Sequence, residues 1–118
     1  MKKLSEQELH NLAMNIVGRE LEAQGYEFMA VNSSLKKNPQ FVCIKEKQVS
    51  FIVVRAVIFS KNPKRYDEVI MKKIKKHAAE FNAEIYYAGV GLANTSDDRL
   101  PLYLNEEYIV EYEGPIKI

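Results

Sequence analysis

The chain has 118 residues, of which 47% are hydrophobic, and its formal net charge is +1. This length and composition favour a single domain over residues 1–118 with a buried core, and the longest apolar run is too short to span a bilayer. A single cysteine, Cys43, excludes an internal disulfide and a metal site built on several cysteines. Because Met1 is followed by polar residues and not by a signal-peptide pattern, we expect a cytoplasmic location and no membrane contact.

The first half of the chain predicts a helix followed by three strands. A capping box from Ser5 to Glu8, followed by apolar residues at helical spacing, indicates a helix over about residues 6–24. Apolar and β-branched segments at residues 26–31, 41–45 and 49–59 indicate strands. The second and third of these strands are separated by a short polar turn, so we expect them to form a hairpin.

The second half predicts another helix and further strands. Asn62-Pro63 opens a helix that runs to about Asn82. The apolar face expected for this helix consists of Ile70, Ile74, Ala78 and Phe81. A buried strand follows at residues 83–92, with short strands at 101–104 and 108–112. We therefore expect an α/β fold, a single mixed β-sheet with flanking helices in the order α-β-β-β-α-β-β.

Charge is distributed unevenly along the chain. Residues 36–77 carry twelve Lys and Arg against three acids, whereas residues 78–118 carry eight acids against two basic residues. The basic segment could meet a nucleic acid or another anionic partner, or the acidic tail could pack beside it and neutralise it. The candidate nucleic-acid-binding residues are Lys36, Lys37, Lys61, Lys64, Arg65, Lys72, Lys73 and Lys76.

Signatures of catalysis are absent from the sequence. Residues 89–94 contain two glycines but lack the third glycine and the following helix of a phosphate-binding loop. We expect His10 to be exposed near the start of the first helix, His77 to pack or cap at the rim of the second, and Cys43 to be a small core residue. No acid, base and nucleophile converge, so we expect no enzyme activity, no catalytic residues, no cofactor and no metal site.

Arg55 is the one charged residue within the most apolar run, residues 50–59. Isolated burial of a guanidinium is costly, so this residue needs an anion or a carboxylate as its partner. Glu20 is the only acid within the apolar arc of the first helix, and we hypothesise that Glu20 and Arg55 meet in a cleft together with Gln40. Three alternatives are open: a structural Glu20–Arg55 ion pair, a small anion or nucleotide-like ligand bound at Arg55, or a side chain that extends to an exposed edge.

The order α-β-β-β-α-β with Arg55 on the third strand resembles the restriction-endonuclease-like fold of PD-(D/E)xK nucleases. The segment LEAQGYEFMAVN, residues 21–32, is similar to the helix end and first strand of the small YraN-like members. The resemblance implies that an aspartate on the second strand and an acid-x-lysine on the third would bind magnesium. In this sequence those positions hold Gln40, Val53 and Arg55, which lack the required carboxylates and the tunable lysine. The resemblance thus implies a nuclease-like fold with a degenerate active site.

The chain also resembles short bacterial proteins named after the flavin- and NADH-binding component of the sodium-translocating NADH–quinone reductase. That component has a membrane anchor, a four-cysteine iron–sulfur motif, and flavin- and NADH-binding domains, none of which can be placed on this sequence. We expect instead a non-catalytic domain that binds a protein partner or forms a homodimer, with the tyrosine-rich acidic segment 102–116 as the contact edge. Nucleic-acid or small-anion binding through residues 36–77 and Arg55 is the alternative.

Overall fold

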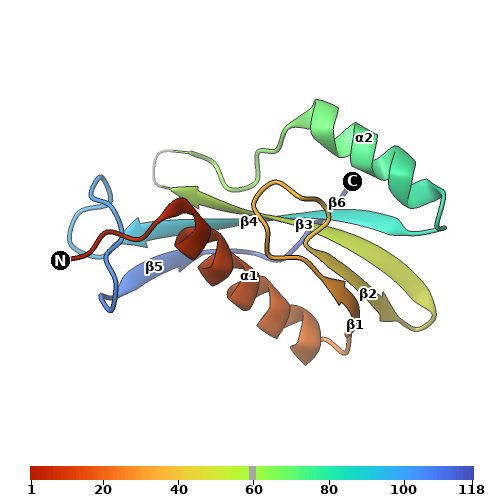
Figure 1. Ribbon diagram of the computed structural model, residues 1–118, viewed down its shortest axis with the longest axis horizontal. Helices are drawn as coiled ribbons and strands as arrows, with labels where there is room; N and C mark the ends of the chain where they lie inside the picture. Colours follow the sequence, from red (N-terminus) through yellow and green to blue (C-terminus); the bar gives the residue numbers. More distant parts are fainter. Residues whose placement is uncertain (59–60) are drawn as a thin grey trace.

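In the part of the chain that the structure describes, six strands form an open mixed sheet and two helices cover it, one on each face (Figure 1). The computed structural model describes residues 1–58 and 61–118, so the predicted end of the third strand at Phe59 lies outside the described residues. The elements are α1 (Glu6–Ala23), β1 (Glu27–Val31), β2 (Phe41–Lys45), β3 (Gln48–Ile58), α2 (Glu68–Ala79), β4 (Glu84–Asn94), β5 (Tyr108–Glu111) and β6 (Ile116–Lys117). This order confirms the predicted α/β class and adds β6, which the sequence did not indicate.

Local hydrogen bonds determine where α1 begins. The hydroxyl of Ser5 accepts from the N–H of Glu8 at 3.1 Å, and the Glu8 carboxylate accepts from the N–H of Ser5 at 2.9 Å, which confirms the predicted capping box. The bonds from Ser5, its backbone N–H first, lower the pKa of the Glu8 carboxyl. After the helix, Gly25 has a φ of +91°, a conformation that glycine adopts without strain. The chain therefore turns directly from α1 into β1.

The second helix is shorter than predicted. It begins at Glu68, because the Asp67 carboxylate accepts from the N–H groups of Val69 and Ile70 at 3.0 and 3.1 Å and caps the helix there. The residues expected to open the helix form an irregular segment instead, and Pro63 is buried against β4. Of the two helices described, neither is long and apolar enough to cross a membrane.

The buried face of α2 also differs from the predicted face. Met71 and Ala78 are buried, whereas Ile70 and Phe81 are 42% and 57% exposed. Phe81 follows the end of the helix, and its ring contacts Phe51 with a centroid distance of 5.9 Å. The predicted face is thus confirmed at Ala78 and at Ile74, which packs against the same cluster, whereas Met71 takes the buried place expected of Ile70.

Strand pairing is antiparallel from β1 through β3 and parallel between β3 and β4, which gives the order β1-β2-β3-β4-β5. The β2–β3 hairpin is confirmed, and α2 supplies the crossover between the two parallel strands. β5 and β6 pair with successive stretches of the other edge of β4. The strand expected at residues 101–104 is wrong: Tyr103 makes only an isolated bridge to Lys3, next to Pro101, which has no N–H to donate.

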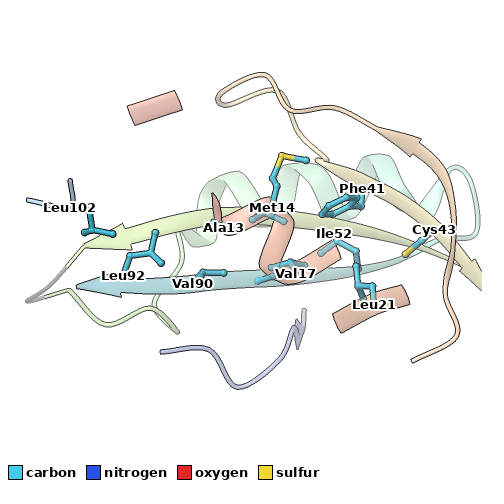
Figure 2. Close-up of a cluster of buried hydrophobic side chains, with 12 residues drawn as sticks. Ala13, Met14, Val17, Leu21, Phe41, Cys43, Ile52, Val90, Leu92 and Leu102 are labelled. Carbon is cyan, nitrogen blue, oxygen red and sulfur yellow. The ribbon is translucent and has the colours of Figure 1, made fainter. Parts of the chain in front are cut away.

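The alternation of side chains along β3 divides the core into two layers. Ile52 and Val54 pack on the α1 side, whereas Phe51 and Val53 pack on the α2 side. Figure 2 shows the larger, α1-side cluster, in which α1 contributes Ala13, Met14, Val17 and Leu21. Arg55, two residues after Val53, therefore belongs to the α2 side of the sheet.

We expect Gly89→Ala to destabilise the fold strongly. A Cβ at Gly89 would lie 1.9 Å from the carbonyl oxygen of Pro63, so the backbone of this loop would have to move. Overpacking costs about 1–3 kcal/mol, and more when backbone must shift, so the free energy of unfolding in urea should fall by at least ~2 kcal/mol. Gly18→Ala is the control, because its Cβ meets only the ring of Phe41, at 3.3 Å, and alanine favours a helix. Equal stability of the two variants would contradict the packing of Pro63 on β4.

Candidate functional site

β2 leaves β3 well before β3 ends. The last residues of the two strands to pair are Phe41 and Ile52, after which the N–H of Gln40 donates to the carbonyl of Ile52 at 3.0 Å. β3 continues to Ile58, and its pairing with β4 extends to that residue. Beyond Ile52, β3 therefore has one edge paired with β4 and one edge along which no strand lies in residues 1–58 and 61–118.

The side chain of Gln40 takes the place of the missing strand at the start of this edge. It is fully buried, and its Oε1 accepts a hydrogen bond from the N–H of Val54 at 2.7 Å. Its Nε2 donates to the carbonyl of Lys37 and to Asn38 Oδ1, both at 3.2 Å. Because a buried N–H without a partner costs about 1–3 kcal/mol, Gln40 stabilises both the strand and the loop that precedes β2.

Arg55 lies beside Gln40 and is held by three hydrogen bonds. Its Nη1 donates to the carbonyl of Val54 at 2.9 Å and to Gln40 Oε1 at 3.4 Å, while Nη2 donates to Asn38 Oδ1 at 2.8 Å. The side chain is half-buried, and this burial lowers the pKa of the guanidinium, with an opposing effect from nearby Tyr87. No described carboxylate forms an ion pair with Arg55. The structure thus brings Arg55 and Gln40 together around an uncompensated positive charge.

The expected pairing of Glu20 with Arg55 is wrong. Glu20 belongs to α1, which covers the opposite face of the sheet from Arg55. Its Oε1 is buried without a hydrogen-bond partner, 3.8 Å from the place that a Cβ on Gly114 would occupy. Burial, and then the charge of Glu20, raise the pKa of the Tyr112 hydroxyl. Glu20 therefore lies against the C-terminal segment and not in the cleft.

A groove of about 1050 Å³ runs along the unpaired edge of β3. It lies at the carboxyl ends of β3 and β4, the region where open α/β sheets bind ligands. Its other walls are the start of α1 and the loops before β2 and after β4. Much of the lining is apolar, including Leu4, Leu9, Leu35, Val57, Leu92 and Leu102. The charged residues of the lining are the cations Lys3, Lys36, Arg55, Lys61 and Arg99 and the acids Glu6 and Asp98.

His10 is buried in the wall of this groove, so the expectation that it is exposed is wrong. The residue is 3% exposed, and its Nε2 has no hydrogen-bond partner. Burial, and then the positive charge of Arg55, lower the pKa of the imidazole. The buried stripe of α1 runs through His10, Met14, Val17 and Leu21. The helical spacing of these residues is the sequence signal that could have identified His10 as a buried position.

Two other candidates stand apart from the groove. His77 is exposed on α2, with its Nδ1 3.6 Å from the Glu80 carboxylate and its ring against Phe81. Cys43 is fully buried and its Sγ donates weakly to the carbonyl of Ser50 at 3.7 Å. Burial raises the pKa of the Cys43 thiol to about 11, which suits a core residue and not a nucleophile.

The candidate nucleic-acid-binding residues fall into separate groups. Lys36 and Lys61 line the groove. Lys64 forms an ion pair with Glu113, so the acidic tail meets the basic segment at this position. The others are exposed on loops or on α2: Lys37, Arg65, Lys72, Lys73 and Lys76.

The structure shows what surrounds Gln40, Val53 and Arg55, the positions that the resemblance to nucleases aligns with metal-binding and catalytic residues. Val53 is buried in the core under α2, while Gln40 and Arg55 bond to each other. Within the described ranges, no group of three or more His, Cys, Asp or Glu could hold a metal ion. What the site offers is a positive charge and hydrogen-bond donors, an arrangement that suits an anion.

Fold and site together define the class of protein as an α/β domain with an open mixed sheet. A groove at the carboxyl ends of its two parallel strands contains an arginine whose side chain is fixed by hydrogen bonds. The chain belongs to the family described as a domain of unknown function (DUF8840), whose model matches residues 7–118. No curated protein and no solved structure matches the chain.

We expect Gln40→Met to lower the free energy of unfolding by about 1–3 kcal/mol. The N–H of Val54 and one N–H of Arg55 would lose their acceptor while the volume of the side chain is largely kept. Urea denaturation measures the loss. Gln24→Met is the matched control, because Gln24 is exposed at the end of α1. An equal loss in both variants would show that the Gln40 amide does not support β3.

We expect the thiol of Cys43 to resist labelling by a disulfide reagent at mildly alkaline pH until the protein is unfolded. The residue is fully buried, and its raised pKa of about 11 leaves little thiolate. The rate of thiol release is compared with and without denaturant, and Ser34→Cys in an exposed loop supplies the reactive control. Rapid labelling of Cys43 in the folded protein would restore it as a candidate nucleophile.

Proposed function

We propose that the chain is a non-catalytic protein-interaction module whose groove binds an extended segment of a partner protein as an added strand on β3. The observation that carries the proposal is the unpaired edge of β3 after Ile52, which lies in a groove with apolar walls and a surplus of cations. In strand addition, backbone hydrogen bonds supply affinity and the pockets around alternate side chains supply specificity.

The peptide groups on the open edge are those of Ala56 and Ile58, of which the Ile58 carbonyl already accepts one bond, from the N–H of Lys61 at 3.4 Å, and has a second lone pair for an added strand. Peptide groups alternate in direction along a strand. Because Ile52 and Val54 bond toward the β2 side, Ala56 and Ile58 direct their groups to the same side. Gln40 already satisfies the N–H of Val54, so an added strand would start beyond it. The open ladder is short, and the walls of the groove must supply much of the contact.

The chemistry of the walls indicates what kind of segment fits. Apolar residues dominate the lining, so alternate apolar side chains of the segment can be buried there. The cations Lys3, Lys36 and Lys61 favour a segment that carries acidic residues, whereas Arg99 is already paired with Asp97. We therefore commit to an extended, apolar and acidic segment of a partner protein as the occupant.

The segment 102–116, expected from the sequence to be the contact edge, is the weaker candidate. All residues of β5 are exposed, and Ile109 is 52% exposed, so this edge is accessible. Pairing of β5 with β5 of a second copy would, however, bring Glu111 and the neighbouring acids of both copies together, and like charges across strands are destabilising. Leu102 is moreover buried. These observations favour a partner protein in the groove over a homodimer through β5.

The likeness to nucleases supports the non-catalytic part of the proposal. The order of elements from α1 to β4 is the one expected of a restriction-endonuclease-like core, and Gln40, Val53 and Arg55 stand where such a core would carry its metal-binding and catalytic residues. We infer a nuclease-like domain whose former catalytic positions now stabilise β3 and shape a binding groove. The bond between Gln40 and the N–H of Val54 supports this change of role.

Nucleic-acid binding is the second candidate, favoured by the exposed lysines of α2. Lys72, Lys73 and Lys76 form no ion pair with any described carboxylate. This function predicts that the chain retards duplex DNA or RNA in a gel at low salt, with an affinity that falls steeply as salt is added. Absence of retardation at low salt would eliminate it.

We expect peptides selected by the purified chain from a displayed random library to respond to N-methylation in an alternating pattern. In an added strand, every second N–H bonds to β3, so methylating those positions should weaken binding by about tenfold, whereas methylating the others should not. Fluorescence anisotropy of labelled synthetic peptides measures the affinities. An effect that is independent of position would contradict strand addition.

Two exposed apolar residues supply a matched pair of variants for the same assay. Ile58→Asp places a negative charge in the groove and should weaken binding of an acidic peptide by at least about tenfold, whereas Val69→Asp on α2 should leave it unchanged. Equal effects would place the binding surface elsewhere. Sedimentation of the chain with and without peptide tests whether the natural occupant of the groove is a second copy of this chain. In that case the chain alone would sediment as a dimer, and the peptide would dissociate it.

A further inference from the structure

We infer that the groove contains a carboxylate-binding subsite formed by Arg55, with His10 in the wall of the same groove. The inference rests on the groove being the binding site, and it names the charged group that the ligand must carry. It depends on the hydrogen-bond geometry of Arg55 and on the absence of a described counter-charge, both of which are independent of strand addition.

The first observation is the count of donors on the guanidinium. An arginine has five N–H groups, and the bonds to Val54, Gln40 and Asn38 use both groups of Nη1 and one of Nη2. The N–H of Nε and the second N–H of Nη2 have no acceptor among the described residues, and neither nitrogen is an unsatisfied buried atom. Nε and Nη2 form one edge of the planar group, and such an edge binds a carboxylate through two parallel hydrogen bonds.

The second observation is the missing counter-charge. The acceptors that hold Arg55 are neutral carbonyl and amide oxygens, and neither Glu6 nor Asp98, the acids of the groove, forms an ion pair with it. A half-buried cation in neutral surroundings attracts an anion, because an anion compensates for the lost hydration. The three existing bonds already hold the guanidinium in place, so little side-chain entropy remains to be lost when a ligand binds.

The third observation is His10. Its side chain is buried in the wall of the same groove, and its Nε2 lacks a partner, which is costly for a buried polar atom. The charge of Arg55 is near enough to lower the pKa of the imidazole. Because Nε2 has almost no accessible surface, a ligand in the groove does not reach it, and His10 contributes a neighbouring ring whose NMR signals report on binding at Arg55.

A monocarboxylate fits this arrangement better than a phosphate. The subsite offers one fixed positive charge with two parallel N–H donors, which match a single negative charge on a planar group. The apolar side chains of Leu9 and Leu102 in the same groove favour a carboxylate attached to an apolar group. That carboxylate could belong to a free apolar acid, to the C terminus of a peptide or to an acidic side chain.

Hexanoate tests the subsite on the intact chain, and hexanamide, a neutral analogue of the same shape, is its control. In NMR titrations we expect hexanoate to shift the Arg55 Nε–H and the His10 ring signals saturably, and hexanamide to shift neither. Saturation by inorganic phosphate at lower concentration than by hexanoate would overturn the assignment to a carboxylate. Equal responses to hexanoate and hexanamide would show that no charge is recognised.

Variants separate the paired donors of Arg55 from the general charge of the groove. Arg55→Lys keeps the charge but loses the edge of two N–H groups, so hexanoate affinity should fall by roughly fivefold or more. Lys61→Met removes another cation of the groove and should change the affinity by less than about twofold. A loss in Lys61→Met as large as in Arg55→Lys would overturn the subsite, and wild-type titrations remain decisive if a variant does not fold.

Three capped dipeptides identify the source of the carboxylate: acetyl-leucyl-leucine with a free C terminus, its C-terminal amide, and the amide of acetyl-leucyl-glutamate. Binding of the first alone indicates a C terminus, binding of the first and third indicates any peptide carboxylate, and binding of hexanoate alone indicates a free acid. Hexanoate bound at Arg55 without an alternating N-methyl pattern would overturn strand addition and leave the subsite intact. The alternating pattern without a response to hexanoate would overturn the subsite alone.

Discussion

The groove depends on the hydrogen bond from the N–H of Val54 to the side chain of Gln40. A central strand that loses its neighbour halfway along must otherwise bury an unsatisfied donor, which costs about 1–3 kcal/mol. One amide side chain closes the ladder at this point, and the strand beyond it can remain open on one edge. The same oxygen also accepts a hydrogen bond from Arg55, so a single buried residue ends the β2–β3 pairing and orients the charge of Arg55.

The two-layer arrangement explains why the charge of Arg55 remains uncompensated. Residues of β3 alternate between the faces covered by α1 and α2, and Arg55 falls on the α2 side. α2 begins only at Glu68 and places its buried residues, Met71 and Ala78, over the other end of the sheet with Phe51. The guanidinium instead reaches the edge of β3 and the loop before β2, where neutral oxygens hold it. Its position at the end of the covered surface makes it available to a ligand.

Features that local sequence determines were predicted well, and features that depend on distant contacts were not. The capping box, α1, the hairpin and β4 follow from spacing and turn residues within a few positions. The start of α2 was placed too early, because the buried contact of Pro63 with β4 cannot be read from its neighbours. Glu20 was assigned to the wrong partner, since alternation along β3 separates two faces without saying which helix covers each. The burial of His10 was missed because the helical pattern was centred on Leu9, one residue away, and the groove itself combines four segments that only the tertiary structure brings together.

The origin of the groove walls has a practical consequence. Its walls come from the start of the chain, the loop before β2, the end of β3 and the loop after β4, so the groove exists only while the molecule is folded. Any compound that occupies it must raise the melting temperature, since binding to the native state alone adds about 2.7 kcal/mol at a hundredfold excess over the dissociation constant. For a domain of this size that gain corresponds to a shift of several degrees. Calorimetric or dye-based screening of compound collections can therefore search for the natural ligand without any prior assay of activity.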